Sequence, residues 1–212
     1  MTPSELEAAA RNRYNAIGDP HFSTDMIMDV IYQASMQLAN EAFVIQRHYQ
    51  TTSTSGTKEY AFPTNAFAVR RIEYKGKKLY PVPLEYDPKT STTEPSGTPG
   101  TYAIWNEELL LFPTPDTTGD QIDVYTYNRP QAVTSSSTLE VPEEYHLDMI
   151  DLILSVMYAK DQNTSMSTYH RNLWEASINR VKRHNRKKQH GDQYAVVRDQ
   201  VDNPSYPGLI VL

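Results

Sequence analysis

Four residues in the second half of the chain have side chains that could do chemistry at close spacing: Glu143, Glu144, His146 and Asp148. Residues three apart share a helix face, so His146 could act with Glu143 as an acid–base pair or hold a metal ion. However, Pro142 comes directly before them, and acidic residues in the first turn of a helix are favoured by the helix dipole. We therefore interpret this cluster as the beginning of a helix.

The remaining motifs give no positive sign of catalysis. The sequence contains no cysteine and only eight glycines. These counts exclude thiolate metal sites and cysteine nucleophiles, and no glycine-rich phosphate-binding motif is present. Asp116 and Asp120 flank a turn without the ligand spacing of a calcium loop. We expect a protein that is not an enzyme and that binds no cofactor or metal.

A dense group of cations stands out from a chain whose net charge is −6. The helix dipole favours cations only in the last turn and does not explain six within nine residues. A solvated basic face, contact with an acidic protein surface and contact with nucleic acid all fit such a run. The six cations are Arg180, Lys182, Arg183, Arg186, Lys187 and Lys188.

The last part of the chain, residues 191–212, has no helical periodicity and ends on a short apolar run. It has too few apolar residues in register to offset the cost of ordering it alone, so we expect it to become ordered only on a partner. Its candidate partner-binding residues are Tyr194, Val196, Val197, Tyr206, Leu209 and Ile210.

The first fifty residues have the apolar periodicity of two helices. The first is expected to begin with a capping box at Thr2 and Glu5, to include Ile17, and to end at Gly18. The second is expected after Ser23. Its apolar residues recur every three or four positions, at Ile27, Val30, Ile31, Ala34, Leu38, Ala42 and Ile45.

Residues 51–136 hold most of the prolines and most of the alternating patterns, which predicts a β-rich segment. Tight hairpin turns are expected at Lys75-Gly76 and Asn106-Glu107. In the last strand, Ile122, Val124 and Thr126 should share one face. The expected strands cover 58–62, 69–74, 78–82, 101–105, 109–112 and 121–127, with an irregular loop over 87–100.

Residues 137–190 predict two further helices. The stretch 145–158 is apolar around nearly its whole circumference, which is typical of a central, buried helix. Substitution of Leu152, Ile153 or Val156 should therefore lower stability more than substitution of Leu79, which is expected in a hairpin. The fourth helix should run to about residue 190. Its expected buried stripe is Tyr169, Leu173, Trp174, Ile178 and Val181.

These elements predict an α+β fold. We expect a four-helix core with an inserted β-strand-rich domain between the second and third helices, and an extended C-terminal tail. In this division, residues 1–50 and 137–190 are the two halves of the helical core. Residues 51–136 form the inserted β domain, and residues 191–212 form a docking tail.

The order of several short segments is distinctive. Phe-Pro-Thr-Pro at 112–115 comes before a tyrosine-rich strand, and Val-Pro-Glu-Glu-Tyr-His at 141–146 opens a helix. Earlier segments at 58–63, 69–79, 83–87 and 97–104 complete the succession. Over residues 22–190 this order resembles the head-to-tail adaptor, or connector, proteins of tailed bacteriophages.

The resemblance implies a structural virion protein without catalytic residues. Such a protein assembles as a homo-oligomeric ring, usually of twelve copies, beneath the portal protein. The ring extends the DNA channel and offers an attachment surface to the tail nozzle or tail-tube protein, with tail fibres as a further partner. DNA would pass through the lumen without sequence-specific binding and no membrane would be involved. The protein would be assembled in the host cytoplasm and reside at the head–tail junction.

Two other classes of function stay open at this point. One is a nucleic-acid-binding accessory protein that uses the basic helix 180–188, whose affinity would fall steeply with salt. The other is a carbohydrate-active enzyme on the β segment, which needs two carboxylates about 5 to 10 Å apart.

Overall fold

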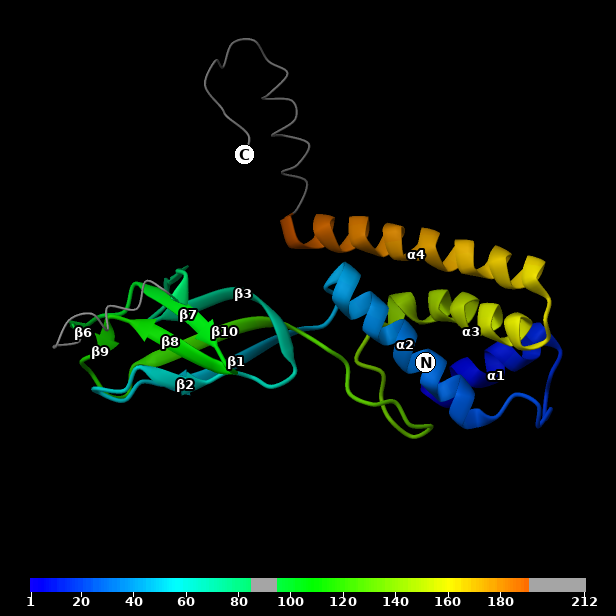
Figure 1. The fold of residues 1–212 in the computed structure, drawn as a ribbon, viewed down its shortest axis with the longest axis horizontal. Coiled ribbons are helices and arrows are strands. Elements are labelled where there is room, and N and C mark those ends of the chain that lie inside the picture. Colours follow the sequence, from blue (N-terminus) through cyan, green and yellow to red (C-terminus); the bar gives the residue numbers. More distant parts are fainter. Residues whose placement is uncertain (85–94, 191–212) are drawn as a thin grey trace, which may run out of the picture. The chain divides into compact units, whose positions relative to one another are not determined.

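The computed structural model describes residues 1–84 and 95–190, with side chains as far as Lys188. The chain forms two compact units (Figure 1). Among the described residues, the helical unit contains Met1–Val44 and 132–190, and the β unit lies within Ile45–Gln131. Four α-helices and several sheets confirm the expected α+β class.

The first helix, α1, covers Pro3–Tyr14 and begins with the expected capping box. The Glu5 amide donates to Thr2 Oγ1 at 3.3 Å, and the Thr2 amide donates to Glu5 Oε2 at 2.8 Å. The helix ends earlier than expected because Asn15 adopts a left-handed conformation with φ of 62°, which is a common way to end a helix. Ile17 therefore lies outside the helix and is 76% exposed, so its assignment to the first helix is wrong.

The second helix, α2, covers Thr24–Ala42 and is capped by Ser23, whose side chain accepts from the Met26 amide. It ends because Phe43 is left-handed, with φ of 54°. The chain then enters strand β1, Gln46–Thr52. Residues 46–50, which we assigned to the helical half, are therefore strand.

The third helix, α3, covers His146–Lys160 and follows a 3₁₀ turn, η2, at Glu143–Tyr145. It packs against α1, α2 and the fourth helix, α4, which agrees with its expected central place. Leu152 and Ile153 are fully buried, whereas Val156 is only half-buried.

The fourth helix, α4, covers Thr164–His190. Trp174, Ile178 and Val181 are buried as expected, but Tyr169 and Leu173 are exposed, so their place in the stripe is wrong. The buried line continues through Asn185, four residues after Val181, and positions 169 and 173 lie beside this line instead of on it.

The β unit contains two four-stranded sheets and one short two-stranded pair. The first sheet has the order β1-β10-β3-β4 and is antiparallel throughout. Its other strands are β10 (Gln121–Asn128), β3 (Ala66–Tyr74) and β4 (Lys77–Lys78). The second sheet, in the order β2-β8-β7-β5, contains β2 (Glu59–Ala61), β8 (Glu108–Phe112), β7 (Thr101–Trp105) and β5 (Tyr80–Pro81).

Both predicted hairpin turns are confirmed. Lys75 and Gly76 have φ of 50° and 72°, and Asn106 and Glu107 have φ of 48° and 62°, as a two-residue turn with left-handed centres requires. The expected strand 78–82 is divided between β4 and β5. Most of the expected loop 87–100 lies outside the described residues, and Ser96–Gly97 form β6, which pairs with β9 at Thr114–Pro115.

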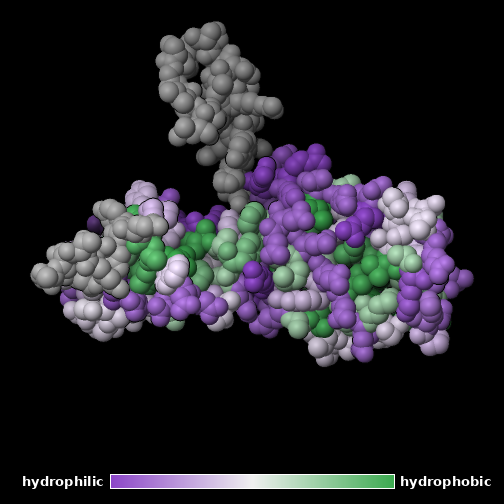
Figure 2. Space-filling view, viewed as in Figure 1, coloured by the Kyte–Doolittle hydropathy of each residue, from purple (hydrophilic) through white to green (hydrophobic). Residues whose placement is uncertain are grey.

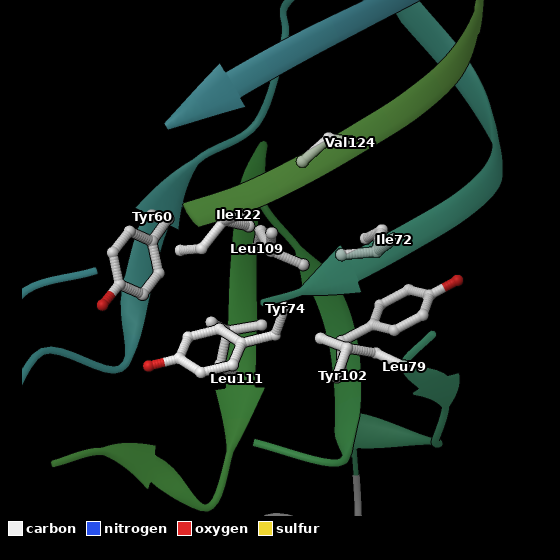
Figure 3. Packing of buried hydrophobic residues seen from close by; sticks show 9 residues of the cluster. All are labelled: Tyr60, Ile72, Tyr74, Leu79, Tyr102, Leu109, Leu111, Ile122 and Val124. Carbon is white, nitrogen blue, oxygen red and sulfur yellow. The ribbon is translucent and has the colours of Figure 1, made fainter. Parts of the chain in front are cut away.

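Side chains from both sheets pack into one core (Figure 3). Ile122 and Val124 of β10 point into it as expected, and Thr126 on the same face is also buried. Leu79 is 1% exposed within this core, so it is as deeply buried as Leu152, and burial gives no reason for Leu79 to contribute less to stability. The other core residues are Tyr60, Ile72, Tyr74, Tyr102, Leu109 and Leu111.

Among the described helices, none combines the length and the apolar character needed to cross a membrane.

We expect Leu152→Ala to lower the free energy of unfolding by about 2 to 5 kcal/mol, because Leu152 is buried in α3. Leu147→Ala on the same helix is the matched control. Leu147 is 57% exposed, so its loss should cost no more than about 0.5 kcal/mol. Urea unfolding followed by circular dichroism measures both values. Equal losses would contradict the central place of α3.

We also expect the helical unit to fold without the β unit. The entry and exit of the β unit lie side by side, because the Asn128 amide donates to the Ile45 carbonyl at 3.0 Å. A short Gly/Ser linker in place of residues 45–131 should therefore span the gap. Far-UV circular dichroism of this variant should show a cooperative helical melt. A gradual, non-cooperative loss of helix would show that the helices depend on the β unit.

Candidate interaction surface

One face of α4 is held by specific polar contacts with α2. Trp174 is buried, and its Nε1 donates to Gln37 Oε1 at 2.6 Å. Asn185 is also buried, and its Nδ2 donates to the carbonyl oxygens of Ala42 and Phe43, the latter at 3.0 Å. The last carbonyls of a helix have no partner inside the helix, so Asn185 caps the end of α2.

Three of the six cations in the basic run also bind neighbouring elements of the helical unit. Arg180 donates to both oxygens of Asp148 in α3, one of them at 2.6 Å. Lys182 Nζ lies 2.6 Å from Glu41 Oε2 of α2, and Lys188 Nζ lies 3.2 Å from Glu144 Oε1. Hydrogen bonds from Tyr145 and Lys188 lower the pKa of Glu144. These three cations thus have acidic partners within their own chain.

The other three cations, Arg183, Arg186 and Lys187, are exposed and lie on one side of α4. Arg183 Nε makes only a long contact, 3.4 Å, with the Asn179 carbonyl of its own helix. Within the described part of the chain, none of the three forms an ion pair. We call them the basic surface. The C-terminal half of α4 is strongly hydrophilic (Figure 2), and like charges gathered this way attract an anionic partner.

The acidic cluster at the start of α3 has structural partners. Glu143 lies 3.0 Å from the amino group of Met1, and His146 Nε2 lies 2.7 Å from the Val141 carbonyl. His146 is buried, and burial lowers its pKa. Among residues 1–84 and 95–188, no group of three or more His, Asp or Glu side chains could hold a metal ion.

The aspartates of the β unit are also engaged. Asp123 accepts hydrogen bonds from His48 Nε2 at 2.8 Å, from Gln50 Nε2 at 3.0 Å and from Gln121 Nε2 at 2.8 Å. Burial acts to raise the pKa of Asp123, but these hydrogen bonds together lower it. Lys75 and Tyr74 both donate to Asp120, which lowers the pKa of that carboxyl. Both carboxylates therefore act as acceptors within the sheet.

The sequence reasoning placed all six cations in one surface, whereas the geometry divides them into three that pair with acids of the same chain and three that do not. The sequence reasoning also missed Asn185. Its position four residues after Val181, on the same helix face, was the pattern that could have indicated its burial. The six candidate residues of the tail, Tyr194, Val196, Val197, Tyr206, Leu209 and Ile210, lie outside the described residues.

Comparison with known proteins gives one clear relationship. No curated protein matches the chain. A family model described as SU10 adaptor protein matches residues 1–199, which include every described residue and the whole of the basic surface. The chain therefore belongs to the SU10 adaptor protein family.

Proposed function

We propose that this protein is a structural component of the virion that forms a ring beneath the portal protein. The observation that carries the proposal is membership of an adaptor family over residues 1–199. This ring extends the DNA channel and gives the tail nozzle or tail-tube protein a surface to bind. Twelve copies would match the rings that the sequence resemblance implies, and tail fibres are a further partner.

The basic surface is the part of α4 proposed to contact the portal. Arg183, Arg186 and Lys187 have no acidic partner within the described chain, and they lie just before the residues 191–212. An acidic patch on the portal would complement them and would set the orientation of docking. The tail, from Tyr194 to Ile210, would then add apolar contact. Arg180, Lys182 and Lys188 would hold α4 in place during docking.

The proposed ring lets DNA pass without gripping it. The net charge of −6 supports this part of the proposal, because a ring of subunits that are acidic as a whole does not attract phosphates. No catalytic step is proposed for the protein. Its place is the head–tail junction, after assembly in the host cytoplasm.

The alternative is a nucleic-acid-binding accessory protein that uses residues 180–188. The contacts of α4 favour it less, because Arg180, Lys182 and Lys188 are already neutralised by acids of the same chain. Only three cations of the run are then left for phosphates.

We expect the triple variant Arg183→Glu, Arg186→Glu, Lys187→Glu to lose binding to purified portal rings, since charge reversal would place acids against acids. The matched control reverses three exposed cations elsewhere, Arg13, Lys77 and Arg171, and should bind like the natural protein. Co-sedimentation with portal rings at low and high salt measures the binding of both triple variants. The same assay on a variant truncated after Gly191 tests the tail. Natural binding by the first variant would exclude the basic surface as the portal contact.

We expect only weak affinity for double-stranded DNA. The slope of log K against log salt, measured by fluorescence anisotropy, should be no steeper than about −3, because three phosphate contacts contribute about −0.9 each. A slope steeper than about −5 would require all six cations and would favour the nucleic-acid-binding alternative.

A further inference from the structure

Strand β1 forms one edge of the first sheet and is much longer than the other edge strands. It has seven residues, whereas β4 and β5 have two each and β2 has three. Natural proteins usually protect sheet edges with short strands, prolines, bulges or charges. Strand β1 contains no proline, pairs with β10 without a register shift, and carries one charge, Arg47. It is an open edge.

The direction of the backbone groups in β1 follows from two hydrogen bonds. The Asn128 amide donates to the Ile45 carbonyl at 3.0 Å, and the Ser53 amide donates to the Asp120 carbonyl at 2.8 Å. Along an antiparallel strand, the N–H and C=O groups of successive residues point alternately toward and away from the neighbouring strand. The backbone groups of the odd-numbered residues of β1 therefore face β10. The N–H and C=O groups of Gln46, His48, Gln50 and Thr52 point away from the sheet, and within the described residues they have no hydrogen-bond partner.

Side-chain contacts within the sheet order the open edge without any partner. The side chains of His48 and Gln50 both bind Asp123 of β10. The His48 ring also stacks on Tyr125, with ring centres 4.4 Å apart and planes 6° apart. An edge that is ordered in advance loses little conformational entropy on binding.

We propose that β1 pairs antiparallel with β1 of a second copy of this chain, about a two-fold axis at Tyr49. In this register Gln46 lies opposite Thr52 of the second copy and His48 lies opposite Gln50. These four residues are those whose backbone groups point outwards, so every outward N–H and C=O between positions 46 and 52 finds a partner in the other copy. The two first sheets become one continuous sheet.

The side chains favour a second copy as the occupant. Arg47, the single charge of β1, lies opposite Thr51, so no like charges face each other. Tyr49 lies opposite Tyr49 at a position without backbone hydrogen bonds, where opposing side chains approach most closely. The Tyr49 ring is half-buried against the β core and its hydroxyl accepts from Asn128 Nδ2 at 2.9 Å, so it is held ready for an aromatic cross-strand contact.

A two-fold contact closes on itself and cannot by itself propagate a ring. The β1 pairing therefore describes the free protein before assembly. It is independent of the proposed function, because a dimer through β1 would form whether or not the chain binds a portal.

The test uses the full chain with a proline at an outward-facing position. Gln50→Pro removes an outward N–H and leaves the ladder with β10 intact, since prolines are tolerated where the N–H faces away from the sheet. Gln50→Thr is the matched control, because it removes the same side-chain amide and keeps the N–H. Light scattering of the natural protein should give a mass twice that of one chain, which is 24.2 kDa. The proline should weaken the dimer at least about tenfold, and the threonine less than about threefold.

Hydrogen exchange of the natural protein gives a second readout that needs no variant. The amides of His48 and Gln50 should exchange slowly at high concentration and rapidly on dilution, whereas the Tyr49 amide, which faces β10, should stay protected at both. A natural protein that is monomeric up to about 100 µM would overturn the proposal, and so would a folded Gln50→Pro variant that dimerises as before.

Discussion

The position of α4 depends on a buried line of residues that contains two polar groups. Trp174 must donate to Gln37, and Asn185 must donate to the last carbonyls of α2, because buried polar groups without partners are costly. A rotation of α4 about its axis would break both contacts at once. The apolar residues Ile178 and Val181 lie between them and bury the rest of this face. The helix therefore has one orientation on α2 and α3.

That orientation decides which cations are available. Positions 180, 182 and 188 come next to acids of α2, α3 and η2, while positions 183, 186 and 187 are turned to solvent. Surface ion pairs are individually weak, at about 0 to 1 kcal/mol, so the paired cations add less to stability than the buried line does. Their larger effect is on the electrostatic pattern, because they confine the unpaired charge to one side of α4.

The sequence was most informative where one face of an element is buried. The capping box of α1, the stripe of α2, the apolar α3 and the alternation in β10 were all predicted from their patterns. Strand β1 was missed because it is a largely exposed edge strand, so its polar residues show no alternation, and its partner β10 lies some seventy residues away. The charge pattern located the basic run. Which of its cations form ion pairs depends on Asp148, Glu41 and Glu144, and only the folded chain brings these acids near the run.

The central claim is that α4 presents Arg183, Arg186 and Lys187 to a partner while its other cations stay bound within the helical unit. A cryo-EM structure of the protein assembled on its portal tests this most directly. The account predicts portal carboxylates within about 4 Å of the three exposed cations, with the pairs of Arg180, Lys182 and Lys188 unchanged. A structure in which these three cations face solvent or the DNA channel would contradict it.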